Sequence, residues 1–418
     1  MEEIKPKEKI FTPYQLFVIA ILVFMQFTVI LDFMVLSPLG VILMPKMNMT
    51  ASQFGVVVSA YAFSSCIAAI AAAGVADRFD RKKYLLFVYT GFLLGTLFCA
   101  LAVDYYSLLA ARIFTGIFGG LVTSCALAIV TDLFKLEVRG RVMGSLMMAF
   151  AGAQVLGLPI GLFLAKHFSW HMPFIMIVGI GLIVGIVITI RLKPIVGHLE
   201  LKTDRDPFHH LWVTFSNPDH LRAFAASMLL ATGGFMLMPF GSTFAVNNMH
   251  RTLDEIPYIY LATGISSMVL GPLIGFLADK VGKFNVFVFG SVLTAIMVGV
   301  YTNLGPTPLY LAIILNIILF AGITSRMISS SALISAIPKP QDRGAFMSIN
   351  SAMGNLAGGI AAIIAGYIVH QETPTSPLEH YDRLGYVVIG VIAAVAGFMF
   401  ILNRHVQKNL SVPANKPI

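Results

Sequence analysis

The sequence predicts an all-α membrane protein with twelve transmembrane helices, arranged as two pseudo-symmetric six-helix bundles. Of its 418 residues, 57% are hydrophobic and only 11% are charged, and the mean hydropathy is +0.85. A soluble domain carries about 25% charged residues, so lipid is the expected solvent for most of this surface. Two loop motifs that recur at nearly one spacing predict the division into two related halves.

Twelve apolar stretches have the length of a membrane span, because a hydrocarbon core of about 30 Å takes roughly 20 helical residues. The first stretch is too long for the apolar core of a signal peptide and lacks a small-residue cleavage site. We expect the spans at residues 14–43, 53–75, 84–102, 107–131, 142–165, 172–190, 223–247, 256–278, 285–302, 309–335, 345–370 and 384–403.

Lys and Arg residues are distributed unevenly over the connecting segments. With a cytoplasmic N-terminus, 22 of the 28 lie on the cytoplasmic side and four lie outside. Positive charge collects in cytoplasmic loops, so the membrane explains the net charge of +8 better than a nucleic-acid partner does. We therefore expect a multi-pass protein of the cell (inner) membrane with both termini in the cytoplasm.

The longest predicted cytoplasmic connection spans residues 191–222 and has the polar composition of a linker. We expect an N-terminal six-helix bundle over 1–190 and a C-terminal one over 223–418. Within the linker, the pair His209-His210 is better explained by flexible loop than by a metal site. The three cysteines lie in apolar runs without metal-type spacing, so we expect neither a metal nor a cofactor.

Similar charged motifs follow the second span of each predicted half. Asp77, Arg78 and Arg81 lie within residues 73–82, and Asp279, Lys280 and Lys283 lie at the same places within residues 275–284, an offset of 202. Arg139-Gly140 precedes span 5 and Arg343-Gly344 precedes span 11, an offset of 204. Duplicated halves of this kind place a substrate site near the midplane between the repeats.

Residues 275–283 read Gly-x-x-x-Asp-Lys-x-Gly-Lys, which resembles the signature of the loop between spans 2 and 3 in major facilitator superfamily transporters. The first-half copy has Ala73 and Asp80 in place of the two glycines. Arg112 in span 4 resembles the arginine motif of the superfamily, and Asp32 in span 1 resembles the aspartate motif of its drug exporters. The resemblance implies a transporter of the drug:proton antiporter branch, working as a monomer by alternating access. The stretch Gly157–Gly161 of span 5 resembles the antiporter motif only in part, with a displaced proline and no final paired glycine.

The two loop motifs contain candidate gating residues. Asp77 and Asp279 oppose the positive-inside rule, and a carboxylate is stabilised by the positive N-terminus of a nearby helix. We expect a cluster that forms when the inner side closes and separates when it opens. Simple anchoring at the membrane surface explains Arg78 equally well. The candidate gating residues are Asp77, Arg78, Arg81, Asp279, Lys280 and Lys283.

Among the 20 Asp and Glu residues, only Asp32 lies well inside a predicted span. A carboxylate there costs on the order of 2.5–3.5 kcal/mol on insertion scales. It is tolerated when protonated, and it needs a partner when ionised. Arg112 in the neighbouring span 4 is the expected partner. The pair can either carry the coupling proton or act as a static link between two helices, and the sequence leaves both possibilities open.

Arg326 lies in span 10, about three turns from the predicted inner end, and no acid occurs in the second-half spans. We expect it to face a water-filled cavity and attract an anionic or zwitterionic group; snorkelling toward the interface is the alternative. Gly233, Gly234 and Pro239 predict a bend in span 7. The other candidate cavity residues, each of which could serve helix packing equally well, are Gln154, Asn316, Asn350, Asn355, Phe235 and Met236.

The predicted function is proton-coupled export of small amphiphilic drugs or metabolites. The alternative is a facilitator, an importer, or a lipid- or siderophore-type transporter, with an anionic or zwitterionic substrate anchored by Arg326. The expected partners are a small-molecule substrate, protons and the bilayer. An enzyme or receptor is disfavoured, because the sequence has no phosphate-binding loop, no intramembrane Ser-His-Asp grouping and no sizeable soluble domain.

Overall fold

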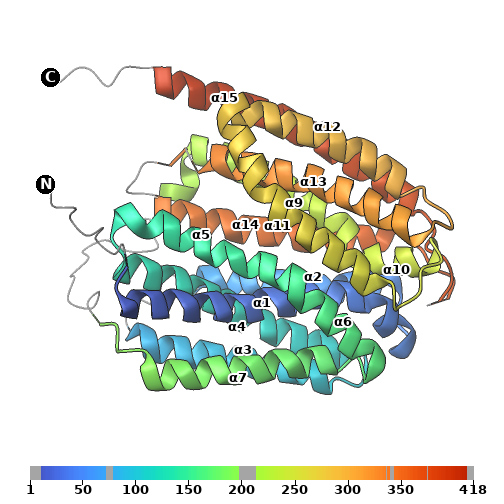
Figure 1. The fold of residues 1–418 in the computed structure, drawn as a ribbon, viewed down its shortest axis with the longest axis horizontal. Helices are drawn as coiled ribbons and strands as arrows, with labels where there is room; N and C mark the ends of the chain where they lie inside the picture. Colours follow the sequence, from blue (N-terminus) through green and yellow to red (C-terminus); the bar gives the residue numbers. More distant parts are fainter. Residues whose placement is uncertain are drawn as a thin grey trace, which may run out of the picture.

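Long antiparallel helices make up the molecule (Figure 1). The computed structural model describes residues 11–71, 79–196, 213–335, 337–338, 343–373 and 375–411. Twelve helices in these ranges are long and apolar enough to cross a membrane, which confirms the predicted spans. The predicted pair His209-His210 lies outside the described residues, as does the end of predicted span 2.

The first half contains six spans, and the fifth is interrupted. Its elements are α1 (Pro13–Lys46), α2 (Ala51–Ala71), α3 (Arg81–Leu101), α4 (Tyr105–Leu133), α5 (Leu136–Gly152), η2 (Ala153–Gly157), α6 (Leu158–His167) and α7 (Met172–Arg191). The interruption is a π-helical turn, η2, which is followed by Pro159 near the start of α6. Because proline has no N–H, it disturbs the hydrogen-bond ladder of the preceding turn.

The second half also contains six spans, and its first span is interrupted. Its elements are α9 (Pro218–Leu237), η4 (Met238–Phe240), α10 (Gly241–Asn247), α11 (Ile256–Val281), α12 (Lys283–Tyr301), α13 (Leu309–Ile334), α14 (Arg343–Ile368) and α15 (Tyr381–Ser411). The regular helix of span 7 is interrupted at Pro239, one of the residues that predicted a bend, which lies in the 3-10 turn η4 between α9 and α10. Gly233 and Gly234 remain within the regular helix α9.

Buried apolar residues show where the two halves meet. One continuous core cluster joins first-half residues such as Leu39 and Phe54 to second-half residues such as Phe240 and Ala362. These residues lie toward the predicted outer ends of their helices. At the predicted cytoplasmic end, each half has a separate cluster, represented by Leu85 in the first half and by Phe346 in the second. The halves are therefore sealed together at the predicted outer end.

Small residues allow the helices of the two halves to approach closely there. A Cβ on Gly55 of α2 would meet the carbonyl oxygen of Ala362 on α14, and a Cβ on Gly366 would meet that of Ala51. The hydroxyl of Ser37 on α1 donates to the carbonyl oxygen of Met238 in η4. Close backbone contact through small residues is how membrane helices associate without a hydrophobic driving force.

Candidate functional site

Asp32 and Arg112 form an ion pair inside the first half. The Nη1 atom of Arg112 lies 2.8 Å from Oδ2 of Asp32, and both side chains have an exposed fraction of 0%. Asp32 comes from the middle of α1 and Arg112 from the first third of α4. The structure thus brings together the two residues predicted to form a pair. Their opposite charges offset each other's burial.

Thr96 on α3 also contacts the carboxylate of Asp32. Its hydroxyl lies 3.1 Å from Oδ1 and is within donating distance. The Nε and Nη2 atoms of Arg112 are buried and have no hydrogen-bond partner among the described residues. The carboxylate is therefore well satisfied, whereas the guanidinium retains free donors.

A row of aromatic side chains runs from Arg112 to the second half. The guanidinium carbon of Arg112 lies 4.6 Å from the ring centroid of Tyr61 on α2. The Tyr61 ring lies 5.3 Å from Phe33, which follows Asp32 on α1, and Phe33 lies 5.7 Å from Phe235 on α9. Centroid separations of 4.5–7 Å are typical of interacting rings. Phe235, a predicted cavity residue, therefore connects the ion pair to the other half.

Uncharged residues stand in the second half at the places that match the pair. Met236 lies 204 residues after Asp32, and Asn316 lies 204 residues after Arg112. The same offset separates the motifs at Arg139 and Arg343. The amide oxygen of Asn316 lies 3.2 Å from the Thr263 hydroxyl, and its Nδ2 donates to the Tyr301 hydroxyl at 3.3 Å. Met236 has an exposed fraction of 2% and packs in the shared apolar cluster. The second half thus has a neutral hydrogen-bonded group where the first has charges.

Arg326 lies on α13 with an exposed fraction of 4%. Its Nε and Nη2 atoms are buried and have no hydrogen-bond partner within the described ranges. No ion pair between Arg326 and a described acid was found. A snorkelling arginine would expose its guanidinium, so the burial argues against that alternative.

The remaining predicted cavity residues are dispersed. Gln154 lies in the π-helical turn η2, and its backbone lies beside Gly264 of α11 in the other half. Asn350 and Asn355 lie on α14, and Oδ1 of Asn350 is buried without a partner among the described residues. These three residues therefore do not join the ion pair in one cluster.

At the predicted cytoplasmic end of the first half, the gating candidate Arg81 is the first residue of α3. Its Nε lies 2.8 Å from Oδ2 of Asp132 near the end of α4. Asp80, the residue before it, accepts hydrogen bonds from the backbone N–H groups of Lys82 and Ile195, both at 3.0 Å. Asp80 therefore caps α3 and also holds the segment that follows α7. The gating candidates Asp77 and Arg78 lie outside the described residues.

The matching loop of the second half has a different backbone. Gly282 stands where the first half has Asp80, and its φ of 103° is a left-handed conformation that favours glycine. Lys283 begins α12, and Lys280 lies 4.5 Å from the ring centroid of Phe276. Asp279 is exposed and forms no ion pair with another described residue. The two copies of the motif are therefore not equivalent.

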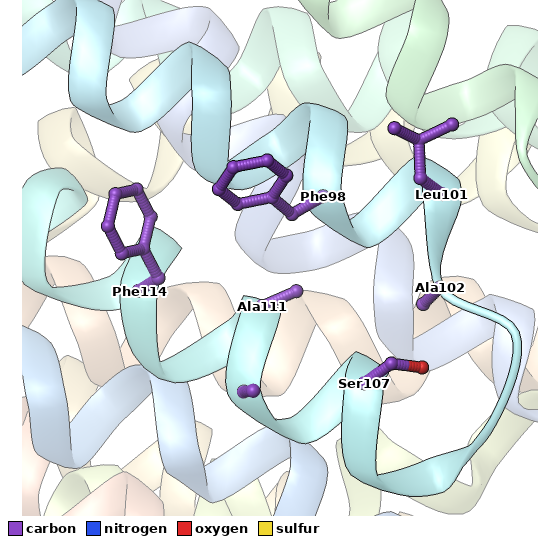
Figure 2. A pocket seen from close by; sticks show the side chains of 7 residues that line it. Phe98, Leu101, Ala102, Ser107, Ala111 and Phe114 are labelled. Carbon is purple, nitrogen blue, oxygen red and sulfur yellow. The ribbon is translucent and has the colours of Figure 1, made fainter.

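A hollow of about 450 Å³ lies between α3 and α4, and Figure 2 shows the side chains that line it. Its walls are almost entirely apolar, and Phe98 and Leu101 on its rim are exposed. Because these exposed apolar side chains face outward from the helix bundle, the hollow faces lipid. It contains none of the predicted site residues, so it is not a candidate substrate site. The residues that line it are Phe98, Leu101, Ala102, Ser107, Ala110, Ala111 and Phe114.

The sequence model of the Major Facilitator Superfamily matches residues 22–325 and, in a second match, residues 223–417. The chain belongs to this superfamily. It is therefore a multi-pass membrane transporter of the superfamily and not an enzyme, as the sequence predicted. The second match covers the C-terminal half alone, in agreement with the internal repeat.

Relatives in the superfamily match over most of the chain. An uncharacterized MFS-type transporter, YceJ of Bacillus subtilis (strain 168), is 27% identical over 92% of this chain and 94% of its own length. The bicyclomycin resistance protein homolog of Haemophilus influenzae is 24% identical over 79% of this chain and 82% of its own length. A solved structure of a bacterial homolog of the human lysosomal transporter Spinster, in an inward-facing and unoccupied conformation, is also similar. Its TM-score is 0.71 at 17% sequence identity, and the match covers 95% of this chain and 98% of that one. The structural likeness establishes the superfamily fold.

Sequence reasoning missed the neutral residues around the site. Thr96, Tyr61 and Phe33 surround the ion pair, and Thr263 and Tyr301 surround Asn316. Threonine and aromatic residues are common in membrane helices, so their occurrence carries little signal. A helical projection from Asp32 and Arg112 could have indicated Phe33, but not the helices that supply Thr96 and Tyr61.

Proposed function

We propose that this superfamily transporter is a proton-coupled exporter of small amphiphilic drugs or metabolites and that it works by alternating access. The buried Asp32–Arg112 pair, connected through aromatic rings to the other half, is the observation that carries the proposal. The relative named for bicyclomycin resistance supports an export function. The proposed location is the inner membrane with both termini cytoplasmic, and the proposed functional unit is a monomer.

Protonation of Asp32 is the proposed coupling event. While Asp32 is ionised, its Oδ2 holds Nη1 of Arg112. A proton on Asp32 neutralises the carboxylate and removes the Coulomb attraction, which is strong because both groups are buried. Arg112 then loses the partner that offsets its own burial, and it must find another anion or move toward water.

The aromatic row supplies a route from this event to the junction of the halves. A displacement of Arg112 changes the cation–π contact with Tyr61. Tyr61 packs on Phe33, which packs on Phe235 of the other half. Since packed cores are bistable rather than continuously deformable, a shift in this row would favour a second arrangement of the two halves.

The state of the gates follows from the predicted orientation. The halves are sealed at the predicted outer end, so we infer a state closed to the outside, and proton exchange at the fully buried Asp32 would require a further opening toward the cytoplasmic side. An ion pair between Lys166 in the last turn of α6 and Asp254 in the loop before α11 joins the predicted outer ends of the two halves and supports this closure. In the outward-facing state this pair and the Ser37–Met238 hydrogen bond would separate.

A test of the proposal uses the purified protein in proteoliposomes with a panel of amphiphilic compounds. We expect an imposed pH gradient to drive transport of at least one compound and Asp32→Asn to abolish the stimulation. Asp104→Asn, a change of an exposed acid in an outer loop, is the matched control and should retain it. Wild-type transport that persists unchanged after the gradient is collapsed would reject proton coupling.

A second candidate is a facilitator, an importer, or a lipid- or siderophore-type transporter of an anionic or zwitterionic compound. The lone buried guanidinium of Arg326 is the observation that favours it. The same proteoliposome experiment separates the two candidates. A facilitator equilibrates its substrate without accumulation, and an importer accumulates it on the cytoplasmic side.

A further inference from the structure

Arg326 is a buried cation without a counter-charge in the described structure. It has an exposed fraction of 4%, and two of its three guanidinium nitrogens are buried without a hydrogen-bond partner among the described residues. The predicted second-half spans contain no Asp or Glu, and the acids of the observed helices, such as Asp279, lie near the helix ends. A buried charge that is neither paired nor hydrogen-bonded is strongly unfavourable. Within the described structure, such a group is therefore free to bind an anionic partner from outside the chain.

Close packing of α12 and α13 fixes the position of Arg326. A Cβ on Gly290 of α12 would lie 3.2 Å from the backbone nitrogen of Arg326, and a Cβ on Gly322 of α13 would lie 3.1 Å from that of Thr294. Glycine at both positions lets the two backbones touch. Because both helices are packed this tightly, Arg326 is held on a rigid element rather than on a mobile loop.

Two hydroxyl groups near Arg326 in the fold also have unused hydrogen-bonding capacity. Ser329 lies one turn after Arg326 on α13, so the two side chains share a face of the helix. Ser291 follows Gly290 on α12. Both hydroxyl oxygens are buried and have no hydrogen-bond partner among the described residues. A guanidinium and neighbouring hydroxyls are the donors that bind carboxylate and phosphate groups.

We propose that Arg326 and Ser329 bind the anionic group, a carboxylate or a phosphate, of the transported compound. This inference rests on the proposed transport of small amphiphiles and narrows the substrate class to amphiphilic acids. The apolar part of the compound would lie along the apolar second-half helices, while Arg326 offers a planar pair of donors to the acid. The site is almost closed to solvent in this state, and a bound anion would give the buried guanidinium a counter-charge, so we expect binding to stabilise the protein.

The test measures binding to the purified full-length protein in an uncharged detergent, without any pH gradient. The probes share one scaffold and differ in charge: 4-phenylbutyrate, 4-phenylbutyl phosphate, 4-phenylbutanol and 4-phenylbutyltrimethylammonium. Radiolabelled 4-phenylbutyrate reports direct binding, and the shift in Tm reports binding of each probe. The variants are Arg326→Gln, Arg326→Lys, Ser329→Ala and, as a matched control, Arg404→Gln at an exposed arginine of α15.

The wild type and Arg404→Gln are expected to bind the two anionic probes at least about tenfold more tightly than the neutral and cationic probes, as a charge-assisted hydrogen bond implies. Arg326→Gln should abolish this preference, and Arg326→Lys should retain part of it. Ser329→Ala should weaken anion binding about tenfold, the lower end of the effect expected for losing one hydrogen bond to a charged group.

Two results would overturn the inference. The first is a wild-type protein that shows no preference for the anionic probes, a result that stands even if Arg326→Gln does not fold. The second is a combination of two observations: dihexanoylphosphatidylglycerol displaces 4-phenylbutyrate from the protein, and 4-phenylbutyrate is not transported in proteoliposomes. Together they would assign the site to a lipid headgroup. Neither result depends on proton coupling, so gradient-driven transport of a neutral or cationic compound would leave the proposed export function standing.

Discussion

The two halves of the molecule bury different chemistry at matching positions. In the first half, Asp32 and Arg112 form a fully buried ion pair. At the matching positions the second half has Met236 and Asn316, and the Asn316 amide is satisfied by Thr263 and Tyr301. Duplication has preserved the fold, while the titratable group is confined to one half.

This difference separates two tasks. A proton can change the charge of the first-half site, because a carboxylate titrates and an amide does not. The neutral group around Asn316 holds helices α11, α12 and α13 together at any pH. The second half instead carries the unpaired Arg326, which suits it to a charged ligand. We therefore expect coupling in the first half and ligand recognition in the second.

The largest expected effect comes from removing one member of the ion pair. Arg112→Ala leaves the ionised Asp32 buried without its partner, which typically costs about 3–5 kcal/mol of stability. We expect a large drop in Tm and in the yield of folded protein, measured by thermal unfolding in detergent. Arg404→Ala, at an exposed arginine, is the control and should leave Tm nearly unchanged.

Making the first half neutral like the second should restore much of that loss. In Asp32→Asn combined with Arg112→Gln, no charge is stranded, so we expect a stability much closer to wild type than that of Arg112→Ala. Proton-driven transport should nevertheless be absent. A double-mutant cycle over Asp32→Asn, Arg112→Gln and the pair measures the coupling energy. Additive effects on Tm would mean that the contact at 2.8 Å contributes no interaction energy.

The neutral network of the second half predicts a smaller effect. Asn316→Ala removes two hydrogen bonds, to Thr263 and Tyr301, and each contributes about 0.5–1.5 kcal/mol. We expect Tm to fall while the pH dependence of transport is unchanged, since neither the asparagine amide nor the Tyr301 phenol that it contacts changes charge near neutral pH. Asn303→Ala, at an exposed asparagine near the end of α12, is the matched control. A shifted pH profile in Asn316→Ala would contradict the separation of tasks.

The two inner loops allow a third comparison, with an effect of about 1 kcal/mol. Gly282→Asp places the first-half residue at a position whose φ of 103° is left-handed. A residue with a side chain loses on the order of 1–2 kcal/mol of stability in that conformation. Asp80→Gly keeps an allowed backbone and loses the cap of α3 and the bond to Ile195, a loss of at most about 1 kcal/mol. Thermal unfolding of both variants measures which one loses more stability. A loss in Asp80→Gly as large as that in Gly282→Asp would contradict the expected difference between the two loops.

The smallest expected effect is at the outer ion pair. Lys166 and Asp254 are both partly exposed, so Lys166→Ala should change stability by less than about 1 kcal/mol. Because the pair bridges the halves, its loss should still favour opening at the outer end. Labelling of a cysteine introduced at Ser37, which is buried at the junction, would measure that opening. An unchanged labelling rate would show that the pair does not bias the two states.

The architecture could be predicted almost completely from the sequence, and the site only in part. Helix length and composition are local properties, so all twelve spans were found. The charges Asp32 and Arg112 were conspicuous because charges inside a span are rare. Which neutral side chains surround them depends on how the helices pack, and Thr96 and Tyr61 carry no pattern that reports this.

Backbone detail was equally hard to predict. The break in span 7 could be predicted from Pro239, since the effect of a proline on a helix is local. The π-helical turn before Pro159 was not predicted, because a proline does not determine which turn relaxes. The function of Asp80, a departure from the superfamily motif, could not be read from the loop alone, since its partner Ile195 is 115 residues away.

Proton exchange at Asp32 can be measured directly on the purified protein. In a lightly buffered solution at constant ionic strength, addition of a transported compound should release or take up protons in the wild type, because in a coupled transporter the binding of the compound changes the proton affinity of Asp32. Asp32→Asn should bind the compound without any proton signal, and Asp104→Asn should give the wild-type signal. Equal proton signals in the wild type and Asp32→Asn would contradict the assignment of coupling to the Asp32–Arg112 pair.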